Sequence, residues 1–198
     1  MTMRASVCAA LFLLAVPRSG AAQQGAGWSI SGSVGQAWFS SAASGESTDF
    51  GPSPGLTAGL GVTRRIARWE LSLMADNTPS VLRASDSVSV LQLSALSFGR
   101  TGLALSVARN LLRPGQVSAI AGAGLRMDGW TLPEEEHRWR AGVGVHAALR
   151  FDAGGLVIEN RLAFGLSRSP FDPADLPDGY RRKSLKWMEV GLGVRVGL

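Results

Sequence analysis

Ionisable side chains recur at every second position in several stretches of this sequence, always on the polar side of an alternating pattern. They are Glu70, Asp76, Arg126, Arg140, His146, Arg150, Glu159, Arg161, Glu189 and Arg195. Carboxylates and guanidinium groups that meet away from water form bidentate ion pairs. A nucleophile beside a base and an orienting acid would instead support covalent catalysis. The pattern therefore poses a choice between a buried ion-pair network and an active site.

The stretch Lys186–Leu198 shows which kind of element would position such charges. Its apolar residues, from Met188 to Leu198, alternate with Glu189, Arg195 and glycines. A period of two is what a β-strand needs to present apolar groups on one side only. One face of this strand is therefore apolar, and the other is small or charged.

The same alternation recurs along the chain. It indicates nine candidate strands, at residues 28–39, 56–63, 69–76, 88–98, 103–108, 117–127, 138–151, 156–167 and 186–198. Loops are predicted at 40–54, 77–86, 128–137 and 168–183, and tight turns at 64–68, 113–116 and 152–155. The stretch 88–98 is the exception to a regular pattern, because its apolar positions change parity near Gln92.

Residues 1–22 have the features of a secretory signal peptide. A positive start precedes the 12-residue apolar run Ala5–Val16, and small residues end at Ala22. This run is shorter than the roughly 20 residues that a transmembrane helix needs. We therefore expect cleavage after Ala22, which removes Cys8 and leaves residues 23–198 as one domain without cysteine.

Length, composition and export together favour one class of fold. A soluble β-sandwich would bury its apolar faces between two sheets, whereas repeated amphipathic strands behind an export signal are typical of a barrel that faces lipid. We predict an all-β fold, a single up-and-down antiparallel transmembrane β-barrel. Bacterial single-chain barrels have an even number of strands, so we expect eight, with ten as the alternative. Residues 88–98 then extend a hairpin beyond the membrane.

The net charge does not indicate a nucleic-acid partner. The formal charge of +5 comes almost entirely from arginine. These arginines are scattered through strand-like runs and turns, without a basic stripe interleaved with aromatic residues. We therefore predict no nucleic-acid binding.

Two glycine-rich strand sequences add a resemblance to a known family. They are Ala121–Leu125, Ala-Gly-Ala-Gly-Leu after an Arg-Pro-Gly turn, and Val190–Leu198, Val-Gly-Leu-Gly-Val-Arg-Val-Gly-Leu. With the export signal and the strands, they resemble the small outer-membrane β-barrel proteins of Gram-negative bacteria, of the outer-membrane-protein-A-like or porin-like class. The resemblance implies a monomer in the outer membrane that contacts its lipids and lipopolysaccharide. It also implies that the barrel-assembly machinery reads the final strand, although this strand ends in Leu198 where the family usually has an aromatic residue.

If the apolar side faces lipid, the charged side faces a narrow lumen. An eight-stranded barrel is just wide enough for side chains to fill its interior, and an unpaired buried charge is costly. We therefore predict a closed barrel with a structural or surface-interaction role. The alternative is a small diffusion pore for ions or solutes. The predicted lumen network consists of Glu70, Arg126, Arg140, His146, Arg150, Glu159, Arg161, Glu189 and Arg195, with Glu159 and Glu189 pairing with the arginines of the last three strands.

The two histidines give little support to an enzyme. Ala148 lies two residues after His146, so an arrangement that resembles the His-x-Ser of a barrel deacylase is missing. We expect Glu159 and Arg161 to face this histidine. His137 adjoins Glu134, Glu135 and Glu136, where a divalent cation could bind, although a solvated run of charge is the commoner case. Without a catalytic motif we predict no enzyme, no cofactor and no metal. A lipid-modifying enzyme is a less favoured alternative.

Tryptophans and loop charges indicate how the barrel would sit in a membrane. Six tryptophans lie near predicted strand ends, as in the aromatic girdles at both lipid interfaces; they are Trp28, Trp38, Trp69, Trp130, Trp139 and Trp187. Arginines crowd the short turns, whereas the long loops carry most of the acidic residues. We predict that the long loops lie outside the cell and the short turns in the periplasm.

Overall fold

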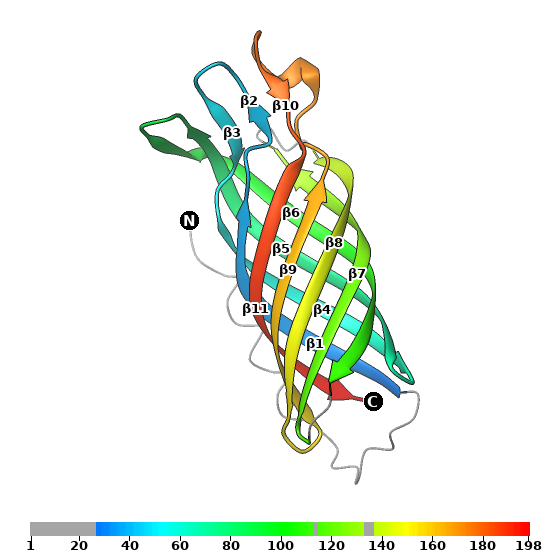
Figure 1. The fold of residues 1–198 in the computed structure, drawn as a ribbon. Helices are drawn as coiled ribbons and strands as arrows, with labels where there is room; N and C mark the ends of the chain where they lie inside the picture. The colour runs from blue at the N-terminus through cyan, green and yellow to red at the C-terminus, as the bar shows by residue number, and fades with distance from the viewer. Residues whose placement is uncertain (1–26, 113–114, 133–136) are drawn as a thin grey trace.

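Eight long antiparallel strands close into a barrel (Figure 1). The computed structural model describes residues 27–112, 115–132 and 137–198, with the backbone alone for 94–97. The predicted signal peptide and Glu134–Glu136 lie outside these ranges. The barrel strands are β1 (Gly27–Phe39), β4 (Gly55–Ile66), β5 (Trp69–Ser85), β6 (Val90–Leu112), β7 (Val117–Thr131), β8 (His137–Asp152), β9 (Leu156–Ser167) and β11 (Leu185–Gly197).

Each strand pairs with its neighbours along the chain, and β1 closes the ring against β11. The predicted all-β barrel of eight strands is thus confirmed, and the alternative of ten is wrong. No helix in the described ranges is long and apolar enough to cross a membrane.

The barrel is apolar outside and charged inside. Leu60 on β4 is 70% exposed, whereas Arg150 on β8 is 2% exposed. This distribution is the reverse of that in a water-soluble protein, where large apolar groups are buried and arginine is rarely buried. It follows from the alternation, because successive side chains of a strand point to opposite faces of the sheet.

The ninth candidate strand is part of β6. Residues 90–98 and 103–108 belong to one continuous strand, whose first part pairs with the last part of β5, and Val88 and Ser89 precede this strand. A register shift between Val81 and Leu82 on β5 lies opposite the stretch where the apolar parity changes. Residues 77–86, predicted to be a loop, are almost entirely β-strand, because β5 continues to Ser85 by pairing with β6.

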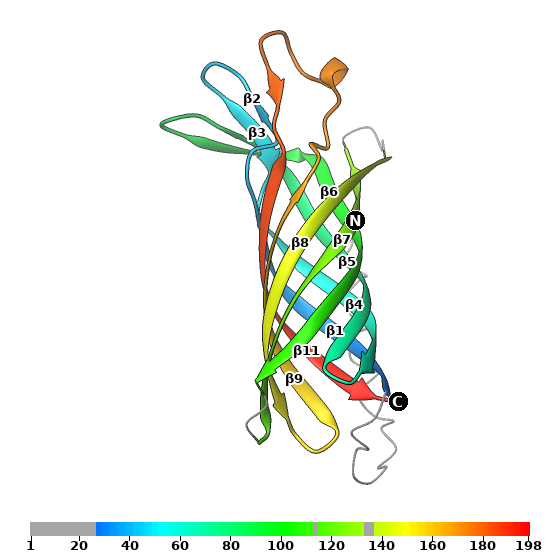
Figure 2. The ribbon, with the colours of Figure 1, turned by 45° about the vertical axis from the view of Figure 1, so that its right-hand side comes forward.

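The ends of the barrel differ. One end, the turn end, carries the tight turns between β4 and β5 and between β8 and β9, together with Gly27 and Leu198 (Figure 2). Ala67 adopts φ 56° in the first turn, and Gly154 and Gly155 adopt φ 71° and 101° in the second. Glycine reaches such values at little cost, so Asp-Ala-Gly-Gly is well suited to that turn.

The opposite end, the loop end, carries additional ordered structure. Strands β2 (Ala43–Ser44), β3 (Asp49–Pro52) and β10 (Arg181–Arg182) extend the sheet beyond β5 in the order β10-β2-β3-β5. A short 3₁₀ helix, η2 (Pro173–Asp175), lies between β9 and β10. The segments predicted as loops at 40–54 and 168–183 therefore form a small sheet above the barrel (Figures 1 and 2).

The tryptophan girdle forms only in part. Trp28, Trp38, Trp69 and Trp139 face outward and are between 37% and 56% exposed. The prediction is wrong for Trp130 and Trp187, which are 0% and 6% exposed. Both lie at inward positions of their strands, in step with Asp128 and Glu189.

Candidate functional site

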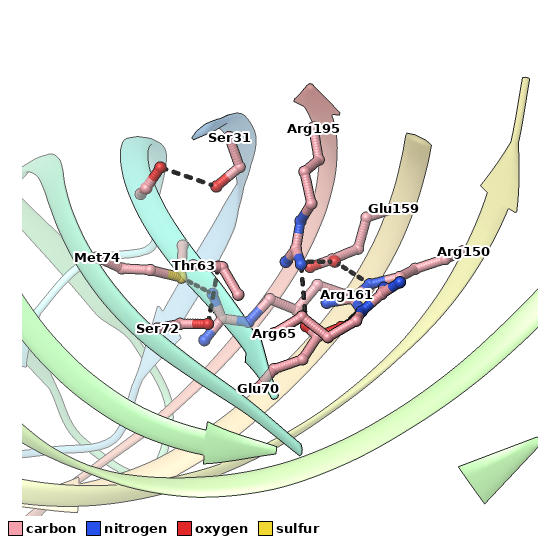
Figure 3. A network of polar contacts seen from close by, with 11 residues as sticks. Ser31, Thr63, Arg65, Glu70, Ser72, Met74, Arg150, Glu159, Arg161 and Arg195 are labelled. Atoms are coloured by element: carbon pink, nitrogen blue, oxygen red, sulfur yellow. Dashed lines mark hydrogen bonds and ion pairs between the residues drawn. The ribbon is translucent and has the colours of Figure 1, made fainter. Parts of the chain in front are cut away.

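The inward charges form two layers across the lumen. The layer nearer the turn end, the Glu70 layer, consists of Arg65, Glu70, Arg150, Glu159 and Arg195 (Figure 3). Glu70 Oε1 accepts hydrogen bonds from Arg65 Nη2 at 3.0 Å and Arg150 Nη1 at 2.7 Å, and its Oε2 accepts one from Arg195 Nη1 at 2.9 Å. Glu159 Oε2 accepts from Arg150 Nε at 2.6 Å and from Arg195 Nη2 at 3.2 Å.

The Glu70 layer ties opposite walls of the barrel together. Glu70 lies on β5, whereas Arg150 and Arg195 lie on β8 and β11, each three strands away around the ring. Glu70 and Arg150 side chains are 2% and 3% exposed. Charged hydrogen bonds of this kind are the strong ones, and removing one partner leaves the others uncompensated. The layer therefore links opposite walls of the barrel through buried ion pairs.

The second layer, the Asp76 layer, lies nearer the loop end and consists of Asp76, Arg100, Arg126, Asp128 and Glu189. Asp76 Oδ1 accepts hydrogen bonds from Arg126 Nη2 at 2.5 Å and Arg100 Nη2 at 3.2 Å. Arg126 Nε donates to Asp128 Oδ1 at 2.5 Å. Glu189 makes a longer contact, 3.7 Å from its Oε2 to Arg100 Nη2. These side chains come from β5, β6, β7 and β11.

Trp187 covers the Asp76 layer. The guanidinium carbons of Arg100 and Arg126 lie 5.7 and 5.2 Å from the centre of its ring. The indole lies against Gly144 and Gly165, and a Cβ on Gly144 would lie 3.0 Å from Trp187 Cζ2. Two glycines on neighbouring strands thus make room for the indole of Trp187 inside the barrel.

An aromatic cluster fills the lumen at the loop end. It consists of Phe39, Phe98, Trp130 and Phe171. Phe98 and Trp130 ring centres are 5.3 Å apart, and Phe39 and Trp130 centres are 5.7 Å apart. Phe171 comes from the loop after β9 and packs on Phe98 at 5.8 Å. The lumen is therefore charged only along part of its length, and apolar side chains pack together at its loop end.

Little space remains between these layers. Two cavities have volumes of about 20 and 10 Å³, and Met74 and Arg161 line both of them. A cavity of about 10 to 15 Å³ holds roughly one water molecule. Arg161 Nη1 lies 2.5 Å from Met74 Sδ, and Arg161 makes no ion pair with a described carboxylate. The two cavities also share Ser33 and Glu189 in their linings, so they lie next to each other.

Several predicted network residues make different contacts from those expected. Arg140 lies nearer the loop end, where it donates to Ser169 O at 2.8 Å and Asp172 Oδ1 at 2.8 Å. Glu189 contacts Arg100 and not the arginines of the last three strands. His146 faces Ala163 across β9, because the register is offset by two residues from that expected. Arg150 is the residue that faces Glu159.

Arg140 and Arg138 hold the loop after β9 onto the barrel. Arg138 forms a salt bridge with Asp175, and Arg140 pairs with Asp172 at 2.8 Å. The hydrogen bond from Arg138 holds the pKa of the Asp175 carboxyl below its usual value, so this carboxylate stays charged at neutral pH. The two arginines fix the segment that delivers Phe171 to the aromatic cluster.

Sequence reasoning missed three members of the two layers, Arg65, Arg100 and Asp128. Each lies at the edge of a predicted strand or just outside it. Asp128 has the inward parity of Arg126, and Arg100 has that of Gly102 and the following even-numbered residues of β6. Continuing each alternation by a few residues would have included all three.

The described residues show no arrangement typical of catalysis or metal binding. His137 Nδ1 lies 3.1 Å from Thr131 Oγ1 on the exposed loop end. The cation site considered for Glu134–Glu136 lies outside the described residues. Within the described ranges, no group of three His, Cys, Asp or Glu residues could hold a metal ion.

Comparison with known proteins adds structural neighbours but no sequence relatives. No protein-family model and no curated protein matches the chain. Among solved structures, the outer membrane protein OprG of Pseudomonas aeruginosa superposes with a TM-score of 0.59 at 13% identity, covering 87% of this chain and 98% of OprG. Neisserial surface protein A (NspA) gives 0.58 at 12% identity, with the same coverage of 87% and 98%. The chain has the fold of the small outer-membrane β-barrels.

A third neighbour of the same fold is a major outer membrane protein from Thermus thermophilus. It superposes with a TM-score of 0.54 at 12% identity, and the match covers 86% of this chain and 99% of the Thermus protein. Nearly the full length of each neighbour is matched, so the likeness extends over the whole barrel. At identities this low the likeness concerns the fold alone.

Proposed function

We propose that this chain is a non-enzymatic, integral outer-membrane β-barrel whose closed lumen braces the wall and whose loop end serves a structural or surface-interaction role. The observation that carries the proposal is that side chains fill the lumen in successive layers along its length. The Glu70 layer, the Asp76 layer, Trp187 and the aromatic cluster occupy the lumen, and two cavities among these side chains have volumes of about 20 and 10 Å³. A filled interior is what the width of an eight-stranded barrel permits.

The outer-membrane location is supported by the outer surface and by the signal-like residues 1–22. Apolar side chains cover the outside of all eight strands, including Leu60, Leu105, Val145 and Leu192. In water such a surface would be an aggregation liability, whereas lipid accommodates it. We propose that the final strand, β11, is read by the barrel-assembly machinery, and that the protein is a monomer in contact with outer-membrane lipids and lipopolysaccharide.

The contacts of the ionisable groups support a structural rather than catalytic role. Every carboxylate of the Glu70 layer is engaged by two or three arginines. His146 is partly buried and makes no hydrogen bond to a described nucleophile. The ordered β10-β2-β3 extension offers a surface beyond the membrane, which favours an interaction role for the loop end.

The closed lumen predicts that the purified protein does not conduct ions. Reconstituted into planar bilayers in molar potassium chloride, it should show no stable channel openings, because two ion-paired layers and the aromatic cluster obstruct the path. A known porin incorporated under the same conditions serves as the positive control. Stable, salt-dependent openings whose ion selectivity changes in Glu189→Ala would establish the diffusion-pore alternative instead.

The proposed orientation predicts which surfaces a membrane-impermeant maleimide reaches on whole cells. Residues 23–198 contain no cysteine, so single Glu46→Cys, Asp178→Cys and Ala153→Cys variants each carry one label site. Glu46 and Asp178 lie exposed at the loop end and Ala153 at the turn end. We expect labelling of the first two on intact cells and of Ala153→Cys only after the outer membrane is permeabilised. The reverse pattern would invert the orientation.

A further inference from the structure

Two arginines stack on tryptophans on the outer surface at the turn end. Arg64 on β4 lies opposite Trp28 on β1, with its guanidinium carbon 5.4 Å from the ring centre. Arg109 on β6 lies opposite Trp69 on β5 at 5.7 Å. Because β1, β4, β5 and β6 are successive neighbours in the barrel, the two pairs form one patch, called here the Arg–Trp patch.

The Arg–Trp patch faces the surroundings of the barrel and not its lumen. Trp28 and Trp69 are 51% and 52% exposed, and both arginines are exposed. The same faces of these strands continue toward the loop end as exposed apolar residues such as Val62. The patch therefore lies near the turn-end edge of the apolar band, with exposed Ile66 and Leu111 beyond it, close to the interface position at which tryptophan is enriched in transmembrane barrels.

The positive charge of the patch is not neutralised by the protein. Among the described residues, neither Arg64 nor Arg109 has a carboxylate within ion-pair distance. Glu70, the acidic residue nearest in sequence to this turn, points into the lumen. Its carboxylate forms ion pairs there with Arg65, Arg150 and Arg195 (Figure 3). Arg68 in the adjacent turn is exposed and adds further positive charge.

We infer that the Arg–Trp patch binds the phosphate of an anionic phospholipid in the periplasmic leaflet. This inference rests on the outer-membrane location and orientation proposed above. Guanidinium groups bind phosphate through paired N–H donors, and stacking on indole holds their planes in place while leaving N–H groups free at the edges. The acyl chains would then lie along the apolar outer faces of β1, β4, β5 and β6.

Competitive lipid binding tests the inference directly. The intact mature barrel, purified in neutral detergent, is offered equal amounts of phosphatidylglycerol and phosphatidylcholine, and the bound lipids are counted by native mass spectrometry. Each basic residue held at an anionic lipid surface contributes about fivefold in affinity. We expect the wild type to prefer phosphatidylglycerol, and Arg64→Gln/Arg109→Gln to reduce this preference about 25-fold.

Two further variants identify the source of the preference. Arg64→Lys/Arg109→Lys keeps the charge but loses the planar donors, and it should retain part of the preference. Arg168→Gln/Lys186→Gln removes two exposed cations from the loop end and should behave as wild type. An unchanged preference in Arg64→Gln/Arg109→Gln, or its loss in the loop-end variant, would overturn the inference.

Gel mobility separates this inference from the proposed function. Each variant is first shown to migrate differently before and after boiling, as a folded barrel does. Equal binding of the two lipids by a protein with such mobility would overturn the lipid site alone. Absence of heat-modifiable mobility in the wild type would overturn the membrane location as well.

Discussion

Replacing Glu70 by Gln is expected to lower the free energy of unfolding of the barrel by about 3 to 5 kcal/mol, the loss typical when one partner is removed from a buried ion pair. The Glu70 side chain is 2% exposed and accepts hydrogen bonds from Arg65, Arg150 and Arg195. Gln keeps the shape but removes the negative charge. Three guanidinium groups are then left with the single carboxylate of Glu159.

The measurement is urea-induced unfolding in lipid vesicles, followed by tryptophan fluorescence and by the fraction of protein with folded gel mobility. Glu189→Gln is the matched control. Its side chain is 14% exposed and has one arginine contact, at 3.7 Å, so we expect a loss of roughly 1 kcal/mol. Equal losses for the two variants would show that Glu70 is not the centre of the layer.

Arg161→Met is a control that is not expected to lower the free energy of unfolding. Arg161 lies beside Met74 and makes no ion pair with a described carboxylate. Replacing this poorly paired, half-buried charge with an apolar side chain of similar length is expected to leave stability unchanged or to raise it. Destabilisation as large as that of Glu70→Gln would mean that Arg161 belongs to the bracing network.

The alternation of residues was enough to predict the architecture and most inward positions. In β9 the predicted and observed bounds coincide at residues 156 and 167, because an amphipathic strand between lipid and a packed lumen leaves no freedom in parity. Glu159 on β9 and Arg150 on β8 therefore have the same inward parity and lie directly opposite each other.

The sequence was less informative where the strands leave the apolar band. Residues 77–85 contain Pro79 and only two large apolar residues, Val81 and Leu82, yet they form strand because β6 supplies a partner across the long hairpin. Pairing partners are long-range information that a single stretch does not contain. The contacts of Glu189 with Arg100, and of Arg140 with Asp172, likewise depend on which strands face each other across the lumen and on where a loop folds back.

Trp187 shows that the parity of a residue in its strand is a better guide to its position than its closeness to a strand end. Its position near a strand end suggested an interfacial girdle, whereas its parity, shared with Glu189, places it inside. The glycines Gly144 and Gly165 provide the complementary space. In a packed lumen, a large inward residue requires small residues on the facing strands.

Replacing Trp187 by Ala is expected to destabilise the barrel by about 3 to 5 kcal/mol, the range found when a buried tryptophan or phenylalanine is truncated in a packed interior. The indole is 6% exposed, and its neighbours Gly144 and Gly165 have no side chains that could move into the space. Arg100 and Arg126 would also lose the ring on which their guanidinium groups lie.

Urea unfolding in vesicles measures this loss, and Trp139→Ala is the matched control because Trp139 is 56% exposed on the outer surface. Trp187→Phe retains a ring and should lose about half as much stability as Trp187→Ala, in keeping with the smaller cavity. If the lumen is closed as proposed, conductance should remain absent in both Trp187 variants, because the aromatic cluster and the Glu70 layer still occupy the lumen on either side of residue 187. Channel openings in Trp187→Ala would show that this one indole, rather than the stacked layers, keeps the barrel shut.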